Sequence, residues 1–152
     1  SVKSATTIAA RLVHAFGEPM DTPHEGLTHL TPSAGRIAGA TLEDVASLGI
    51  VRTRAKCITA LAKAVESGAL VLEPGASPEA TMQQLMALPG IGPWTAQYIA
   101  MRALRWPDAF PKEDLVVRKR LGGTSPARAE AMSEAWRPWR SYAVLHLWRA
   151  EG

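Results

Sequence analysis

Cysteine is almost missing from the chain, which has a single one, Cys57, among its 152 residues. One thiol cannot build a disulfide framework, a four-cysteine zinc site or an iron–sulfur cluster, so the sequence excludes all three from this chain. The four histidines have no spacing typical of metal ligands. We therefore assign no metal site and expect a protein of a reducing compartment.

Long apolar runs are also missing. No segment approaches the about 20 apolar residues of a membrane-spanning helix, and the first residues lack the basic and then apolar pattern of an export signal. Charge of one sign is scarce as well, because the formal net charge is +3 although the pI is about 9.4. This balance permits an anionic partner without requiring one. We expect a soluble protein of the cytoplasm that has no membrane partner.

Alternation of apolar and polar residues with the period of a β-strand is absent, whereas apolar residues repeat at helical spacing along much of the chain. With 47% hydrophobic residues, the chain can bury a compact core, either as one domain over residues 1–152 or as two closely packed helical lobes. We predict an all-α fold, a helical bundle with short connections. Because the chain starts inside a helical pattern, at Ser1, we expect an N-terminally truncated domain.

The expected helices start and end at recognisable caps. Thr41 and Ser77 are typical N-caps, and glycines close several of the segments. The side chains of Met82, Leu85 and Met86 should face the core. An extended connection is expected at 16–33. Helices are expected at 1–16, 41–49, 77–89, 93–105, 114–121 and 138–149, and two further helices are expected, one that ends at 68 and one that begins at 125.

The segment LPGIGPWTA, residues 88–96, joins two of these helices by a very short turn. Gly90 and Gly92 flank one apolar residue, so the backbone can turn tightly and approach another surface where no Cβ intervenes. Ile91 can plug this turn into the core. The amides around both glycines, with the positive end of the helix that begins at Pro93, form an anion site suited to a phosphate. A plain helix–helix turn with a glycine cap is the alternative.

The longer segment LPGIGPWTAQYIA resembles the helix-hairpin-helix of the DNA glycosylase superfamily, which includes endonuclease III-like and 3-methyladenine DNA glycosylase II enzymes. The resemblance to the latter family runs over nearly the whole chain, from SVKSATTIAARL to SYAVLHLWRAEG. It implies a helical-bundle glycosylase domain with its hairpin at about 82–105. It also implies that Gly90, Ile91, Gly92 and Thr95 contact the DNA backbone, which positions the duplex without reading its sequence.

The segment FPKEDLVVRKRL offers two neighbouring carboxylates, Glu113 and Asp114. It resembles the segment of the 3-methyladenine DNA glycosylase II family that bears the catalytic aspartate, and the match implies that this role falls on Asp114. A fixed carboxylate can stabilise the positive charge that builds on the sugar as the N-glycosidic bond breaks. A second acid is not required, because an alkylated purine already carries positive charge and leaves readily. The alternative is that Asp114 only caps the helix that follows it.

Aromatic residues make up 6% of the chain, and three of them are candidates for a base pocket. Trp94 and Tyr98 lie four residues apart and share a helix face. A flipped base needs stacking surfaces, and electron-rich rings favour a cationic alkylated purine. The resemblance adds Trp148 to this pocket, and packing in the core is the alternative for all three. The remaining aromatic residues of the C-terminal segment and one histidine are assigned to the core: Trp136, Trp139, Tyr142 and His146.

Position 94 also bears on the mechanism. Members of the superfamily that cut the DNA strand carry a lysine at this place, and its amine forms a Schiff base. Trp94 has no such amine, so the resemblance implies a monofunctional enzyme that leaves an abasic site. Arg118 and Arg120 are candidate phosphate contacts, as is the basic cluster at 52–56, with solvated helix faces as the alternative.

Together, these residues predict a DNA glycosylase that removes alkylated purines such as 3-methyladenine from double-stranded DNA in base-excision repair. The alternatives are a non-catalytic helix-hairpin-helix DNA-binding module and a glycosylase for mismatched or oxidised bases. We expect a monomer of bacterial type, associated with the nucleoid, that needs no cofactor, although a monovalent cation on the hairpin carbonyls is compatible with this fold. Arg149 stands where relatives have an aromatic residue, so the far wall of the pocket is expected to differ.

Overall fold

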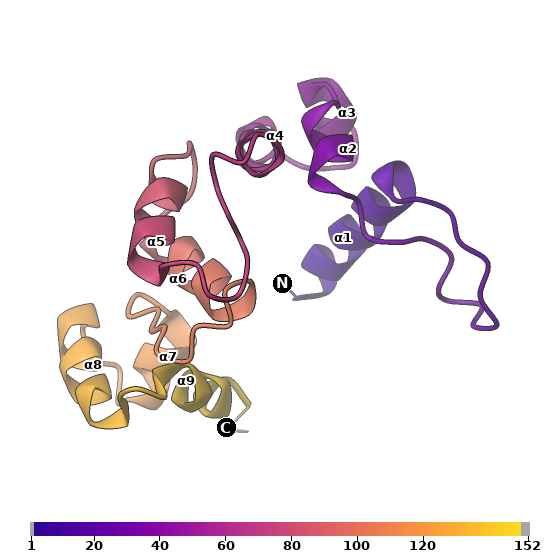
Figure 1. Ribbon diagram of the computed structural model, residues 1–152. Helices are drawn as coiled ribbons and strands as arrows, with labels where there is room; N and C mark the ends of the chain where they lie inside the picture. The colour runs from indigo at the N-terminus through magenta and orange to yellow at the C-terminus, as the bar shows by residue number, and fades with distance from the viewer. Residues whose placement is uncertain (1, 150–152) are drawn as a thin grey trace. The chain divides into compact units, whose positions relative to one another are not determined.

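The computed structural model describes residues 2–149, and its regular structure there is helical apart from one isolated antiparallel bridge between Pro19 and His29. The predicted all-α fold is therefore confirmed. The helices, shown in Figure 1, are α1 (Val2–Phe16), α2 (Ala34–Ala38), α3 (Leu42–Ala46), α4 (Arg52–Glu66), α5 (Pro78–Met86), α6 (Pro93–Arg102), α7 (Leu115–Arg120), α8 (Pro126–Ser133), the 3-10 turn η1 (Glu134–Trp136) and α9 (Arg140–Arg149).

The chain divides into two compact units, and each has its own core. The first contains the residues up to Leu70 together with Leu88–Gly90. Its core consists of side chains from α3, from α4 and from the turn between them: Val45, Ile50 and Ala55. The short helices α2 and α3 pack on α4 (Figure 1). The helix α1 adds Ile8, Leu12 and Phe16 to the same cluster.

The second unit contains Val71–Ala87 and the residues from Ile91 onward. Its core brings together α6, α7, α8 and α9 with the irregular segment between α6 and α7. Phe110 represents that segment in the core, where it meets buried side chains such as Val117 of α7 and Val144 of α9. The helix α7 packs against α9, and α5 packs against α6. The core thus joins the segment before Asp114 to the helix that follows it.

The helix starts inferred from the sequence are observed. Thr41 and Asp44 form a reciprocal capping box at α3, in which each side chain accepts a hydrogen bond from the other residue's backbone N–H. Ser77 caps α5, with Pro78 in its first turn, and Ser125 caps α8 in the same way. These caps satisfy backbone donors that have no partner inside the helix.

Several assignments to the core are wrong. Trp139 and Tyr142 are 58% and 56% exposed, and His146 is also exposed. The reason is helical geometry: Tyr142 and His146 lie on the exposed side of α9, Trp139 stands just before the helix, and Arg140, Ser141 and Val144 occupy its buried side. Trp139 and Tyr142 pack edge to face on each other, at 5.8 Å between ring centroids.

Other differences from the sequence prediction are small. Met86 is 44% exposed rather than buried, because α5 ends there and its inner positions are Thr81 and Leu85. The helix α2 is an additional element, α6 ends at Arg102 and α9 begins at Arg140. Across residues 2–149, the helices are too short or too polar for any of them to cross a membrane.

Candidate active site

Asp114 lies at the end of the irregular segment and is the N-cap of α7. Its Oδ1 accepts a hydrogen bond from the Val117 N–H at 2.8 Å, so the capping role considered for this residue is real. The side chain is nearly buried, and the residue is 8% exposed. A cap of this kind fixes the direction of the carboxylate, which is also what a charge-stabilising group requires.

Two indole groups complete the surroundings of this carboxylate. Trp94 Nε1–H donates to Oδ2 at 2.8 Å, and Trp148 Nε1–H donates to Oδ1 at 3.1 Å. Asp114 thus accepts hydrogen bonds from α6, α7 and α9, all within the second unit. All three donors are N–H groups, and each finds its acceptor in an oxygen of this carboxyl group. The oxygens of a carboxylate have about four lone-pair sites in total, which leaves one for a further partner.

The aromatic residues expected in the base pocket lie together beside Asp114. The rings of Trp94 and Tyr98 stack at 5.3 Å between centroids with 13° between planes, and Trp148 is tilted against Tyr98 at 6.0 Å. A base inserted between two rings needs about 7 Å, because carbon contacts lie at about 3.5 Å. No base fits between Trp94 and Tyr98 in this arrangement. A planar ligand could stack only on an outer face of the cluster.

A cavity of about 360 Å³ opens at the carboxylate. Trp94 and Asp114 line it, whereas Tyr98 and Trp148 do not. Its other walls are Glu113, Leu115 and Val116, and Leu115 is 76% exposed. The sequence analysis did not assign Leu115 and Val116 to the site. One signal could have found them: in a short helix with Val117 as its buried residue, the two apolar residues just after the cap must face outward.

The hairpin glycines differ in conformation. Gly90 has φ of +86°, a value that favours glycine, and a Cβ there would lie 3.3 Å from the Cβ of Cys57 in the same unit. Burial raises the pKa of the Cys57 thiol. Gly92 is the N-cap of α6 with φ of −96°, and a Cβ there would meet no atom within 4 Å. Ile91 is buried, as expected for the residue that plugs the turn.

The basic residues after Asp114 have different surroundings. Arg118 is half-buried, and its Nε donates to the Thr124 carbonyl at 2.8 Å, which holds the turn after α7. Lys119 and Arg120 are exposed and line a second cavity of about 440 Å³ with Leu115 and Val116. The phosphate contacts assigned to Arg118 and Arg120 stay predictions, as do those of the hairpin and of Thr95, which is half-buried.

Two further features bear on the chemistry of this site. Among residues 2–149, no three histidine, cysteine, aspartate or glutamate side chains are placed together to hold a metal ion. Lys112 is the lysine next to the Glu113–Asp114 pair, and its Nζ donates to Glu130 at 2.7 Å. This hydrogen bond raises the pKa of Lys112, so its amine stays protonated near neutral pH.

The helical fold of residues 2–149, with a Gly-x-Gly turn between α5 and α6 and a buried aspartate at the start of α7, is that of the helix-hairpin-helix class of proteins. A model of the HhH-GPD superfamily of base excision DNA repair proteins matches residues 1–141, and the chain belongs to this superfamily.

Curated relatives are similar over the whole of this chain. A Mycobacterium tuberculosis (strain H37Rv) protein named "Probable bifunctional transcriptional activator/DNA repair enzyme AlkA" is 45% identical over 97% of this chain and 30% of its own length. The Escherichia coli (strain K12) protein "DNA-3-methyladenine glycosylase 2" is 37% identical over 100% of this chain and 53% of its own length. The chain thus spans 30% of the length of the mycobacterial relative and about half of the length of the Escherichia coli relative.

Solved structures share the fold. The 3-methyladenine DNA glycosylase from Archaeoglobus fulgidus has a TM-score of 0.79 at 23% identity, over 97% of this chain and 52% of that one. A DNA-3-methyladenine glycosidase from Bacillus halodurans has a TM-score of 0.71 at 26% identity, over 99% of this chain and 68% of that one. A Clostridium acetobutylicum 8-oxoguanine glycosylase/lyase in complex with DNA reaches 0.81 at 16% identity, over 97% of this chain and 53% of that one.

Proposed function

We propose that the protein is a monofunctional DNA glycosylase that hydrolyses the N-glycosidic bond of alkylated purines such as 3-methyladenine in double-stranded DNA. The observation that carries the proposal is the carboxylate of Asp114, which three N–H donors hold at the wall of an open cavity beside Trp94. Family membership and the names of the mycobacterial and Escherichia coli relatives support the same activity.

The chemistry of Asp114 follows from its geometry. Breaking the bond between deoxyribose and base leaves positive charge on the sugar, and a carboxylate that cannot turn away stabilises this charge without reorganising. The same oxygen atoms can orient the attacking water. The N–H donors hold the carboxylate in a single direction, as electrostatic stabilisation of the sugar cation requires.

The aromatic residues support a cationic leaving group. Trp94 presents an indole at the cavity, and an alkylated purine that carries positive charge gains from an electron-rich ring face. The stack of Trp94 on Tyr98 directs the base to the outer face of Trp94, because the space between the two rings is too narrow. A neutral oxidised base would gain less from this surface.

The absence of strand cleavage is part of the proposal. Schiff-base chemistry needs a neutral amine at the sugar, and position 94 carries an indole instead. The ammonium of Lys112 is held by Glu130, and its raised pKa disfavours the neutral form. Borohydride added during turnover should therefore trap no covalent protein–DNA complex. A trapped complex would assign the protein to the bifunctional glycosylases.

Asp114→Asn tests the proposal directly. Methylated duplex DNA should release 3-methyladenine with the unaltered protein, and the variant should lose about 100- to 1,000-fold in rate or more while it still binds DNA. Asparagine is also a good N-cap, so α7 keeps its start. If the variant turns over at the rate of the unaltered protein, Asp114 is not the catalytic carboxylate.

A panel of duplexes with alkylated, oxidised and mismatched bases separates the alternatives. Release of alkylated purines alone supports the proposal, and release of oxidised or mismatched bases points to the other glycosylase class. Binding that weakens with salt, without base release from any duplex, identifies a DNA-binding module.

A further inference from the structure

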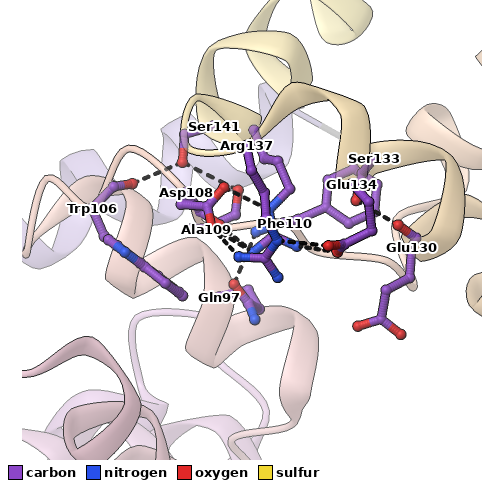
Figure 2. A network of polar contacts seen from close by, with 11 residues as sticks. Gln97, Trp106, Asp108, Ala109, Phe110, Glu130, Ser133, Glu134, Arg137 and Ser141 are labelled. Atoms are coloured by element: carbon purple, nitrogen blue, oxygen red, sulfur yellow. Dashed lines mark hydrogen bonds and ion pairs between the residues drawn. The ribbon is translucent and has the colours of Figure 1, made fainter.

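The segment between α6 and α7 places Asp114 but has no helix or strand of its own. Its backbone is held by side chains from the neighbouring helices (Figure 2). The Ser141 hydroxyl shares its one proton between two carbonyls, those of Trp106 at 2.8 Å and Ala109 at 3.1 Å. The Phe110 N–H donates to Gln97 Oε1 at 3.0 Å. Side chains of α6 and α9 therefore hold the backbone of this segment at residues 106, 109 and 110.

A buried ion pair holds the middle of this segment. Arg140 Nε donates to Asp108 Oδ1 at 2.7 Å, and its Nη2 donates to Asp108 Oδ2 at 2.9 Å and to the Asp108 carbonyl at 2.8 Å. Arg140 and Asp108 are only 6% and 7% exposed. Only the planar fork of an arginine can make these bonds together, to both carboxylate oxygens and to the main chain.

Arg137 is the second cation on Asp108, and it differs in its surroundings. Its Nη1 donates to Asp108 Oδ2, and its Nε donates to Glu134 at 2.8 Å. Its side chain is half-exposed and makes no bond to the main chain of the segment. The two arginines therefore form a natural pair for comparison, because they share one carboxylate but only Arg140 also holds the backbone.

The helix α9 connects the Asp108–Arg140 ion pair to the candidate active site. Arg140 and Ser141 stand in its first turn, and Trp148, which donates to Asp114, stands near its last residue. Trp148 is eight positions after Arg140 in this helix, or about 12 Å further along its axis. One helix thus fixes both the backbone that leads to Asp114 and the carboxylate itself.

We propose that Arg140 is a positioning residue for the Asp114 carboxylate, acting through Asp108 and through the backbone of residues 106–110. This inference rests on the proposed function, because it assigns a reason for the geometry of that same site. A buried ion pair by itself adds little to stability compared with apolar side chains of similar size. The arrangement of the bonds along the segment, rather than the charge alone, is what the pair supplies.

Arg140→Lys keeps the positive charge and removes the fork. We expect the single-turnover rate of base release to fall about 10- to 100-fold, the cost of a carboxylate displaced by about an ångström. The dissociation constant for duplex DNA should stay within about twofold. Arg137→Lys makes the same exchange on the same carboxylate and should leave the rate unchanged. Ala129→Gly lowers the melting temperature from a buried position on α8 and should leave the rate unchanged as well.

The indole N–H signals of Trp94 and Trp148 in ¹⁵N NMR spectra give a readout that does not depend on activity. Both indoles bind Asp114, so both signals should shift in Arg140→Lys and stay in place in Ala129→Gly. If the unaltered protein releases no base, the proposed function fails, and these signals still decide the inference. Unshifted signals, or a rate loss in Ala129→Gly equal to that in Arg140→Lys, would overturn it.

Ser141→Ala keeps the inference testable if Arg140→Lys does not fold. It removes only the hydroxyl that binds the same segment, so the indole signals should shift and the rate should fall several-fold. An unchanged rate with unshifted indole signals in this variant would also contradict the inference.

Discussion

At the scale of single residues, Asp114 makes both a local contact and contacts with distant parts of the chain. Its bond to the Val117 N–H begins a helix, and its bonds to two indoles come from elements more than 15 residues away in the chain. Replacing the carboxylate by an amide would turn one N–H acceptor into a donor. With the remaining oxygen at the cap, the new amide nitrogen would face the Trp94 N–H, which cannot accept a hydrogen bond.

Trp148→Phe separates the hydrogen bond from the aromatic surface. Phenylalanine keeps a ring beside Tyr98 but cannot donate to Asp114, so the carboxylate is held by fewer bonds. We expect base release to slow about tenfold with little change in DNA affinity, measured as the single-turnover rate and as the dissociation constant. Trp139→Phe makes the same exchange at an exposed residue just before α9. It is the matched control and should behave as the unaltered protein. Equal losses in both variants would rule out this role for Trp148.

At the scale of elements, substitutions of the two hairpin glycines are expected to differ in their effect on stability. Gly90→Ala forces a side chain into a left-handed conformation against Cys57 and should lower the free energy of unfolding by roughly 1–2 kcal/mol, measured by urea denaturation. Gly92→Ala has an ordinary φ and open space, so the fold should tolerate it.

DNA binding gives the second half of this comparison. If the backbone at Gly92 approaches a phosphate, a Cβ there should weaken binding to duplex DNA about tenfold while the melting temperature stays the same. Affinity within twofold of the unaltered protein would show that Gly92 serves the turn alone.

The capping box of α3 predicts a dependence on pH. The hydrogen bonds from Thr41 lower the pKa of Asp44 from its ordinary value of 3.8. A carboxyl whose pKa is lower in the folded than in the unfolded chain stabilises the fold above the unfolded value, and this contribution disappears as the pH falls through the folded value. The melting temperature of Asp44→Ala should be lower than that of the unaltered protein near pH 7. The difference should shrink below about pH 4, and a constant difference down to pH 2 would contradict the assignment.

The elements that the sequence predicted well are those with strong local signals. The caps Thr41, Ser77 and Ser125 fix helix starts through bonds within a few residues, so their positions can be inferred without tertiary contacts. The exposure of Trp139 and Tyr142 could not be inferred from the sequence. Their residue types favour burial, and only the packing of α9 decides which side of the helix faces inward. The five-residue helix α2 is too short to show a periodic pattern.

At the scale of the whole molecule, electrostatic attraction to DNA should be moderate. The formal net charge is +3, and the basic residues that follow Asp114 are the candidate phosphate contacts. The logarithm of the binding constant should fall linearly with the logarithm of salt concentration, by about 0.9 per phosphate contacted. Arg120→Ala should make this slope shallower by about 1, whereas Arg128→Ala on α8 should not change it. Equal slopes in all three proteins would remove Arg120 from the interface.

The aspartate and the aromatic residues around it could be predicted, but the shape of the site could not. The family resemblance pointed to Asp114 and Trp148, and helical spacing pointed to Trp94 and Tyr98; these residues lie together in the structure. The stack that closes the space between Trp94 and Tyr98 depends on side-chain rotamers, and no spacing in the sequence encodes it. The network around Asp108 could not be predicted from sequence patterns either, because Arg140 lies 32 positions after Asp108 and only the tertiary fold brings them together.

The two indoles that hold Asp114 are also intrinsic fluorophores, so their fluorescence can report on the site. Trp94 forms a wall of the cavity and is 38% exposed, so a ligand that covers it should change the intensity and wavelength of its fluorescence. Occupancy of the cavity can then be followed in real time on unlabelled protein, with Trp94→Phe to identify the source of the signal.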